Sequence, residues 1–233
     1  MKHLVIGIGE VGGAVMTNLM ALKHNVTTLD IKDEGVKGKF DVLHICFPYS
    51  DNFVDAVKKY KRKFVPDCII IYSTVPIGTT KKIKGAVHSP VEGKHPRLDF
   101  GVKTFKRYIG YNDFVVGKMA AEVWEELDNY ELFNNSDYTE FLKLASTSKY
   151  GINLVWAQYM ADTAEKLGMD YALVKDWDRA YNTLYGRMGM GWAKKYVLDA
   201  PNGPIGGHCV TPNAELLDEQ FPHEMLKMIK EMK

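Results

Sequence analysis

Short apolar runs alternate with amphipathic stretches through the first half of the chain. The apolar runs have few polar interruptions, which is typical of parallel strands covered by helices on both faces. Six strands are predicted, at residues 3–8, 25–29, 41–47, 67–72, 85–88 and 108–110. Helices between them are predicted after residue 9 and at 51–63 and 79–84. This alternation predicts an α/β domain with a parallel sheet.

The second half of the chain carries a helical pattern. Helices are predicted at 113–128, 136–167, 171–185 and 221–230, with an edge strand at 130–133. The longest helix is expected to end at Gly168, because glycine commonly follows the last helical residue. Its apolar surface is wide for a helix covered on one side, so it should lie inside a helical domain or in a dimer interface.

Composition is that of an ordinary globular protein. Hydrophobic residues make up 46% and charged residues 25% of the chain, and the formal net charge is +1. This balance does not point to nucleic acid or a membrane as partner, and no apolar run approaches the roughly 20 residues that span a bilayer. A strand begins at the N-terminus, so no signal peptide is expected. The three cysteines, Cys46, Cys68 and Cys209, fit neither a disulfide framework nor a zinc site, so we expect a cytoplasmic protein without metal.

The clearest chemical signal lies between the first strand and the first helix. This G-x-G-x-x-G pattern places a dinucleotide pyrophosphate at a helix N-terminus. The second strand ends at Asp30, whose carboxylate can bind two ribose hydroxyls and would repel a 2′-phosphate, which favours NAD over NADP. The residues assigned to the cofactor here are Gly7, Gly9, Glu10, Val11, Gly12 and Asp30. A glycine turn in another kind of α/β protein is the alternative.

Two further strands are expected to end at the same rim of the sheet, where such folds bind ligands. Phe47 and Pro48 follow one strand, and Ser73 and Thr74 follow the next. All four are predicted to face the cofactor, with the Thr74 hydroxyl near the nicotinamide. The alternative for Pro48 and for Pro76 is that each proline only marks the start of a loop and has no role in binding.

The fifth predicted strand ends in the segment HSPVEG, on the same rim. Its backbone N–H groups could bind a substrate. His88, Pro90 and Glu92 are the candidate substrate contacts there. A solvated loop is the alternative.

Lys143 lies early in the long helix, next to Leu142 and Leu144. An ammonium among apolar neighbours must point into a cleft or extend outward to solvent. In a cleft it could hydrogen-bond an alcohol oxygen, and desolvation would make it a usable base. The residues alone leave a surface lysine as the alternative.

Cys209 follows two glycines and His208, on a loop whose backbone can approach a ligand. A thiolate there could attack an aldehyde and form a thiohemiacetal. His208 could favour the thiolate or cap the loop. A buried structural cysteine is the alternative, and Cys46 and Cys68, both in apolar strands, fit that role better.

Four segments also carry a family likeness. They are GIGEVGGAV, STVPIGTT, FLKLASTSKYGINLVWAQYMADTAEKLGMD and GGHCVTPN. Through them the chain resembles the 6-phosphogluconate and β-hydroxyacid dehydrogenase superfamily, and within it the UDP-glucose/GDP-mannose (nucleotide-sugar) 6-dehydrogenases. STVPIGTT and GGHC are specific to the nucleotide-sugar branch, whereas SPVEG is similar to the substrate loop of the β-hydroxyacid branch.

The resemblance implies a Rossmann-type, NAD-binding domain at residues 1–115 and an all-helical substrate and dimerisation domain at 116–233. It implies an NAD-dependent dehydrogenase that oxidises a small-molecule alcohol, such as a nucleotide sugar, and forms a homodimer. The family's thiohemiacetal nucleophile corresponds to Cys209, its oxyanion-stabilising lysine to Lys143, and the threonine of its ST-x-P motif to Thr74.

Two positions depart from the family pattern. Thr147 stands where an asparagine follows the lysine by four positions, and Asn213 stands where an aspartate follows the cysteine by four. An amide cannot accept a proton as the aspartate does, so a two-electron oxidation stays open beside a four-electron one. Thr147, His208 and Asn213 are further candidates for substrate contact. The family's additional C-terminal domain is expected to be absent. A catalytically decayed NAD(H)-binding sensor or regulatory subunit is the alternative function.

Overall fold

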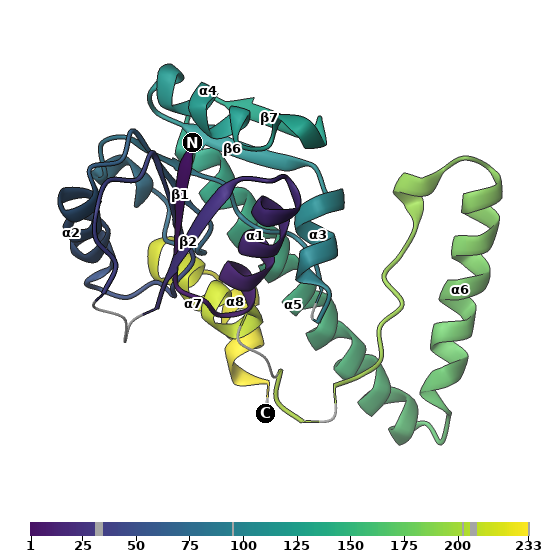
Figure 1. Ribbon diagram of the computed structural model, residues 1–233. Coiled ribbons are helices and arrows are strands. Elements are labelled where there is room, and N and C mark those ends of the chain that lie inside the picture. Colours follow the sequence, from purple (N-terminus) through teal and green to yellow (C-terminus); the bar gives the residue numbers. More distant parts are fainter. Residues whose placement is uncertain (31–34, 95, 202, 206–208, 233) are drawn as a thin grey trace. The chain divides into compact units, whose positions relative to one another are not determined.

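The computed structural model describes residues 1–30, 35–94, 96–201, 203–205 and 209–232 (Figure 1). The chain divides into two compact units, Met1–Lys143 and Leu144–Lys233. This division falls within the long helix α5 (Ser136–Lys166). The sequence placed a domain boundary at residue 115, which stays a prediction; the strand β7, which follows that point in the chain, joins the sheet of the first unit.

The first unit contains a sheet whose strands, among the described residues, follow the order β2-β1-β3-β4-β5-β6-β7. The strands are β1 (Lys2–Ile6), β2 (Asn25–Leu29), β3 (Val42–Ile45), β4 (Cys68–Ile71), β5 (Ala86–His88), β6 (Arg107–Tyr111) and β7 (Tyr130–Phe133). The strands from β2 to β5 pair in parallel, as the apolar pattern predicted. β6 runs antiparallel to β5, and β7 runs parallel to β6. The sheet is therefore mixed at one end.

Helices cover both faces of this sheet (Figure 1). They are α1 (Glu10–Ala21), α2 (Phe53–Phe64), α3 (Leu98–Thr104) and α4 (Phe114–Glu122), with 3₁₀ turns η1 (Thr80–Lys82) and η2 (Glu125–Leu127). Side chains of α1, α3 and α4 pack into one apolar cluster, and those of α2 pack into another. β1 serves both clusters, because Val5 points to one face and its neighbours Leu4 and Ile6 to the other. The doubly covered sheet predicted from the sequence is thus confirmed.

Two details of this unit differ from the sequence prediction. The helix predicted at 113–128 ends at Glu122, where the chain tightens into η2. Helix α3 was not predicted, and it contains Gly101, a residue that weakens a helical pattern. A Cβ atom at Gly101 would lie 2.3 Å from the carbonyl oxygen of Glu92, so close packing requires glycine there.

The second unit is helical. It contains the rest of α5, then α6 (Tyr171–Arg187), η3 (Gly191–Ala193), α7 (Val210–Gln220) and α8 (Glu224–Glu231). Gly151 of α5 lies against α7 and α8, since a Cβ there would come within 2.7 Å of Val210 and 2.9 Å of Ile229. Helix α5 ends before Gly168, whose φ of +70° matches the predicted C-terminal glycine. Helix α7 was not predicted.

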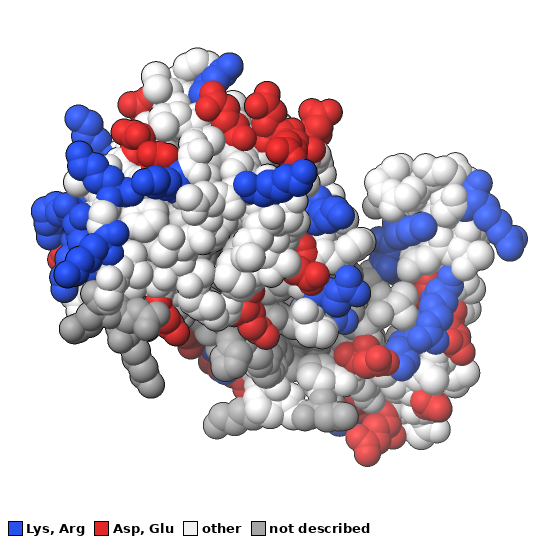
Figure 2. Space-filling model, in the orientation of Figure 1, with Lys and Arg blue, Asp and Glu red and all other residues white. Residues whose placement is uncertain are grey.

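Charge is unevenly distributed over the surface. Figure 2 shows Lys and Arg gathered over α2, whose last turn holds Lys61, Arg62 and Lys63, and acidic side chains gathered over η2. None of the helices in the described residues is long and apolar enough to cross a membrane.

Candidate active site

The chain order of the strands reverses beside β1, because β2 lies on one side of it and β3 on the other. Open α/β sheets bind ligands in the crevice at such a reversal, outside the carboxyl ends of the strands. Gly7 and Phe47 follow β1 and β3 at this point. A Cβ atom on Gly7 would lie 2.8 Å from the backbone nitrogen of Phe47, and Gly7 has a φ of +89°. Both the space and the backbone conformation therefore require glycine.

The other two glycines of the motif have different surroundings. A Cβ on Gly12 would lie 1.8 Å from the carbonyl oxygen of Gly7, so the close packing of α1 against the turn excludes any side chain. A Cβ on Gly9 would meet nothing within 4 Å, and Gly9 has an ordinary φ of −71° as the residue before α1. Nothing in the described fold requires glycine at position 9. Without a side chain at Gly9, a pyrophosphate could approach the backbone N–H groups at the N-terminus of α1 closely.

Asp30 lies at the same edge of the sheet as this turn. The backbone N–H of Gly7 donates to the carbonyl oxygen of Leu29 at 2.9 Å, and Asp30 is the next residue and is exposed. The two parallel strands thus carry the glycine turn and the carboxylate side by side. Glu10, in the first turn of α1, is also exposed, and an acidic side chain is favourable at this end of a helix. The side chain of Val11 packs against the core.

The ends of β3 and β4 are tied together by Ser73. Its buried hydroxyl donates to the carbonyl oxygen of Phe47 at 2.6 Å. The ring of Phe47 packs on Phe53 and Tyr60 of α2, with centroids 5.1 and 6.1 Å away. The side chains of Ser73 and Phe47 therefore hold the rim together, and their contact with a cofactor stays a prediction. Thr74, which follows Ser73, is half-buried.

His88 was predicted to face a substrate, but the structure buries it completely. Its Nδ1 lies 2.9 Å from the hydroxyl of Thr139, and its Nε2 lies 3.2 Å from the carbonyl oxygen of Ser73. Because a carbonyl can only accept, Nε2 carries the proton. Burial lowers the pKa of His88 to about 3, the carbonyl of Ser73 opposes this shift, and Lys143 adds to it. A neutral His88 thus joins α5 to the ends of β4 and β5. The loop after it keeps Pro90 half-buried and Glu92 exposed.

Glu140, which the sequence analysis missed, is the strongest link between α5 and the rim. Its carboxylate accepts hydrogen bonds from the backbone N–H groups of Gly78, at 2.6 Å, and Thr80, at 2.8 Å. Burial raises the pKa of Glu140, and these hydrogen bonds oppose the shift. The segment so fixed directly follows Thr74 and Pro76. The only sign of this role in the sequence is that Glu140 stands beside apolar residues in a predicted helix. That sign does not show which groups, some sixty positions away, the carboxylate binds.

Lys143 follows Glu140 by three positions and is half-buried. Its Nζ donates to the carbonyl oxygen of Val91 at 2.7 Å. Val91 belongs to the loop after β5, so the ammonium lies at the rim of the sheet rather than in solvent. Thr139, Glu140 and Lys143 together attach the start of α5 to the loops that follow β4 and β5.

The remaining predicted residues belong to the second unit. Cys209 is exposed and immediately precedes α7, and the backbone N–H of Asn213 donates to its carbonyl oxygen at 3.1 Å. Asn213 is buried, and Thr147 is half-buried on α5. His208 lies outside the described residues.

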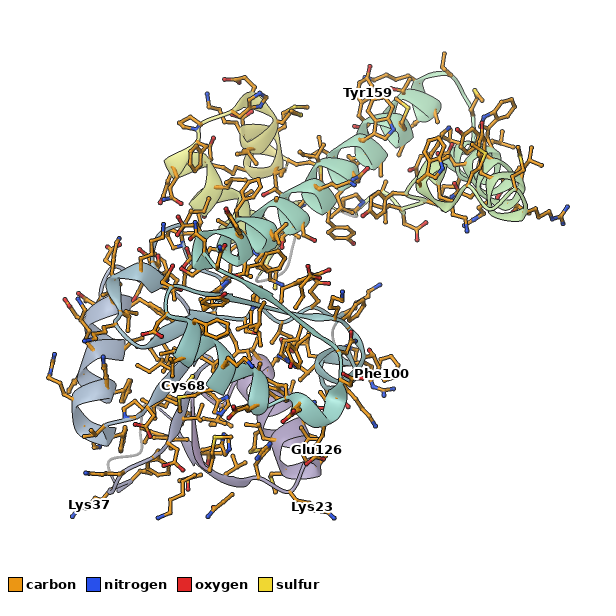
Figure 3. All side chains as sticks on the ribbon, turned by 90° about the horizontal axis from the view of Figure 1, so that it is seen from above. Lys23, Lys37, Cys68, Phe100, Glu126 and Tyr159 are labelled. Atoms are coloured by element: carbon orange, nitrogen blue, oxygen red, sulfur yellow. The ribbon has the colours of Figure 1, made fainter. Side chains whose placement is uncertain are left out.

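Cys46 and Cys68 are buried in the first unit, where Figure 3 labels Cys68. Burial raises the pKa of both thiols, so neither is a nucleophile. Among the described residues, no three His, Cys, Asp or Glu side chains are arranged to hold a metal ion.

Comparison with known proteins supports the fold. No protein-family model matches the chain, and no curated protein matches it by sequence. Among solved structures, UDP-D-ManNAc dehydrogenase from Pyrococcus horikoshii matches with a TM-score of 0.81 at 16% identity, over 99% of this chain and 68% of its own. UDP-glucose dehydrogenase from Pyrobaculum islandicum matches with a TM-score of 0.75 at 17% identity, over 99% and 67%.

A shorter enzyme also matches. The 3-hydroxyisobutyrate dehydrogenase of Mycobacterium tuberculosis has a TM-score of 0.70 at 12% identity, over 98% of this chain and 91% of its own. The chain therefore has the fold shared by nucleotide-sugar and hydroxyacid dehydrogenases, as its motifs indicated. It spans about two thirds of the length of the nucleotide-sugar enzymes.

Proposed function

We propose that the protein is an NAD-dependent dehydrogenase that oxidises an alcohol. The observation that carries this proposal is the contrast among the three glycines of the turn. Gly7 and Gly12 are needed by the fold, whereas Gly9 faces open space at the N-terminus of α1. A ligand that must approach the backbone closely accounts for that glycine. The dehydrogenase folds that match the chain support the same conclusion.

Different residues at this turn would bind different parts of the cofactor. Backbone N–H groups at the start of α1 would bind the pyrophosphate, and the carboxylate of Asp30 would bind the ribose hydroxyls. A 2′-phosphate at that position would meet the negative charge of Asp30, so NAD is preferred to NADP. Bound NAD would supply the oxidant for the alcohol carbon. Backbone groups at Pro48 and the hydroxyl of Thr74 are proposed to lie along the cofactor.

Lys143 is the proposed catalytic group for the alcohol. Its ammonium already donates to one carbonyl oxygen at the rim, that of Val91. A substrate oxygen at this rim could accept from the same ammonium, which would stabilise the negative charge that forms as the alcohol proton leaves. Pro90 and Glu92, on the same loop, are proposed substrate contacts.

Cys209 is proposed to act if the product aldehyde is oxidised again. Its exposed thiolate would add to the aldehyde carbon, forming a C–S bond and a thiohemiacetal oxygen. A second oxidation would convert this adduct to a thioester, which water hydrolyses to the acid and the free thiol. Thr147, His208 and Asn213 are the proposed contacts in this unit, and a nucleotide sugar is the proposed substrate class.

Calorimetric titration of the dialysed protein with NADH, and separately with NADPH, tests the cofactor assignment. We expect NADH to bind tightly and NADPH weakly. In Asp30→Ala, NADH should bind roughly 10- to 100-fold more weakly, because charge-assisted hydrogen bonds contribute about 1.5–3 kcal/mol. Absence of binding by either nucleotide would refute the proposed function.

Counting NADH formed per substrate consumed tests the role of Cys209. Two NADH per molecule support the thioester route, and Cys209→Ser should then stop after one NADH or lose activity. If one NADH forms per substrate molecule and Cys209→Ser keeps full turnover, the enzyme carries out a single oxidation and Cys209 is not needed.

A homodimer is proposed from an uncovered apolar stripe on α6. Its members recur at helical spacing and are 56–76% exposed: Leu173, Trp177, Leu184 and, directly after the helix, Met188. On α5, Tyr159, labelled in Figure 3, is also exposed. Stripes of this kind mark protein interfaces, and a second copy is the partner that the resemblance indicates. Light scattering should give twice the chain mass, and Trp177→Asp should shift it towards the monomer.

A further inference from the structure

A cavity of about 350 Å³ lies within the second unit, and none of the residues assigned to the cofactor lines it. It is enclosed by α5, by α6 and by the segment 194–198, which we call the strap. Its volume is at the lower end of the range of about 300–1,000 Å³ that small-molecule sites occupy. Since all of its lining residues follow residue 143, the cavity is a feature of this unit alone.

The strap is held firmly against α6. The side chain of Asn182 both donates to the carbonyl oxygen of Lys195, at 2.9 Å, and accepts from its backbone N–H, at 2.8 Å. The hydroxyl of Tyr171 donates to the carbonyl oxygen of Leu198 at 3.0 Å. The wall of the cavity is thus built by specific hydrogen bonds at both ends of the strap.

Four lysines line this cavity: Lys149, Lys175, Lys194 and Lys195. Two of them have carboxylate partners. Lys195 pairs with Asp178 at 2.9 Å, and Lys175 pairs with Asp199 at 2.5 Å. Among the described residues, Lys149 and Lys194 form no ion pair. Counting Asp178, which lines the cavity, and Asp199, which pairs with a lining lysine, four lysines less two aspartates leave an excess of two positive charges, which suits a divalent anion.

An aromatic ring lies beside one of the two lysines that form no ion pair, Lys149. The Nζ of Lys149 lies 5.8 Å from the ring centroid of Tyr196 on the strap. Trp156 on α5 also lines the cavity, and Trp156 and Tyr196 are 60% and 53% exposed. Exposed aromatic faces beside cationic groups offer a stacking surface for a planar ring next to a binding point for phosphate.

We propose that this cavity binds a nucleoside monophosphate, or a ligand that likewise joins a flat ring to a phosphate. The phosphate would form charge-assisted hydrogen bonds with Lys149 and with Lys194, whose ammonium would turn towards it from its place beside Gly186. The ring would stack on Trp156 or Tyr196. The existing ion pairs of Lys175 and Lys195 would stay intact, since they hold the walls.

On α6, the proposed site and the proposed dimer stripe use different residues. On α6, Val174, Lys175 and Asp178 line the cavity, whereas Trp177 and Leu184 belong to the exposed stripe. At 100° per residue these two sets point in directions about 120° apart on the helix. A second copy on the stripe therefore need not contact the cavity-lining residues of α6.

Adenosine monophosphate is a suitable probe, titrated into the full chain by calorimetry at low ionic strength. We expect saturable binding that weakens as salt rises, because the phosphate contacts are exposed charges. The variant Lys149→Ala/Lys194→Ala should bind it at least about tenfold more weakly, through the loss of two charge-assisted bonds. Lys166→Ala, at the exposed end of the same helix, is the matched control and should bind it as the parent does. Adenosine and inorganic phosphate alone should each bind more weakly than the joined molecule.

NADH affinity, measured on the same variants, separates this proposal from the dehydrogenase function. It should be unchanged in the double-lysine variant, because those lysines lie outside the glycine turn. If adenosine monophosphate binds the double variant as tightly as the parent, the nucleotide occupies another site and the proposal is wrong. The proposal also fails if no binding is seen up to about 1 mM probe. A chain that lost NADH binding but kept lysine-dependent nucleotide binding would refute only the dehydrogenase function.

Discussion

A Cβ atom on Gly12 would lie 1.8 Å from the carbonyl oxygen of Gly7, about half the 3.4–4 Å of an ordinary van der Waals contact. The first turn of α1 can therefore lie against the end of β1 only if residue 12 is glycine. Two positions from Gly7, at Gly9, the same added atom would meet nothing. One sequence motif thus combines positions required by the fold with a position that only a ligand requires.

This contrast predicts opposite outcomes for two alanine substitutions. Gly9→Ala should leave the free energy of unfolding nearly unchanged and abolish measurable NADH binding, because the new methyl group occupies the place of the pyrophosphate. Gly12→Ala should destabilise the first unit by about 3 kcal/mol or more, since the overlap is with backbone that cannot move freely. Urea denaturation and NADH titration of both variants provide the measurements.

Gly13→Ala is the matched control for the pair. A Cβ on Gly13 would also meet nothing within 4 Å, and this residue lies inside α1. Alanine should raise stability by about 0.5–1 kcal/mol through its higher helix propensity, with NADH binding retained. Equal loss of NADH binding in Gly9→Ala and Gly13→Ala would remove the special role assigned to Gly9.

The parts of the site that the sequence predicted are local in the chain. The glycine turn and Asp30 belong to one strand–helix–strand unit, so their spacing in the sequence is enough to predict that they lie close together. The roles of His88 and Glu140 depend on partners 51 and 62 positions away, in Thr139 and Gly78. No periodicity in the sequence encodes such a pairing, and His88 was accordingly assigned to a substrate when it is a buried link.

The limits of the fold prediction have a similar cause. Alternating apolar runs predicted the strands, but strand direction depends on how the connection passes over the sheet, and β6 returns antiparallel to β5. Helix α3 escaped prediction because Gly101 is needed for contact with Glu92, against its own helix propensity. The packing of distant segments decided both features.

Removal of the Glu140 carboxylate should destabilise the first unit. Glu140→Ala leaves the N–H groups of Gly78 and Thr80 without their acceptor, and each such group costs about 1–3 kcal/mol when buried. We expect the free energy of unfolding to fall by about 2–5 kcal/mol in urea titrations. In Glu140→Gln the free energy of unfolding should fall less, since the amide oxygen can still accept one hydrogen bond. Glu165→Ala, on an exposed part of the same helix, should change little, and a similar loss in that variant would contradict the assignment.

Substitution of Lys143 should affect turnover more than cofactor binding. If its ammonium stabilises the developing oxyanion, Lys143→Ala should lower kcat by roughly 10²- to 10³-fold, equivalent to about 2.7–4 kcal/mol. NADH affinity should stay within about twofold, because the glycine turn is untouched. Lys166→Ala controls for loss of a positive charge on α5. A Lys143→Ala enzyme with the parent kcat would show that this lysine only fixes the loop at Val91.

Acid should destabilise the protein through buried neutral histidines. His3 and His44 are fully buried and joined by a 2.9 Å contact between ring nitrogens, and the hydroxyl of Tyr72 lies 3.0 Å from His44. Burial lowers the pKa of His3 to about 4, and His24 and the N-terminal amine add to the shift while Asp41 opposes it. Burial, followed by His3, His24 and Arg107, lowers the pKa of His44 well below its usual range. His88 behaves in the same way, with a pKa of about 3.

These shifts fix the direction of the pH dependence. Between the unfolded value of about 6.5 and the folded values, the unfolded chain binds protons that the folded chain does not, so stability falls as pH falls. Three such histidines should together remove about 4 kcal/mol on going from pH 7.5 to pH 5.5, at about 1.4 kcal/mol for each histidine per pH unit below 6.5. Urea denaturation at a series of pH values measures this loss, and stability should be level above about pH 7. In His3→Gln, whose amide can still bond to His44, the slope of the free energy of unfolding against pH should fall by the contribution of one proton. A free energy of unfolding that does not change between pH 8 and pH 5 would show that these rings are not held neutral.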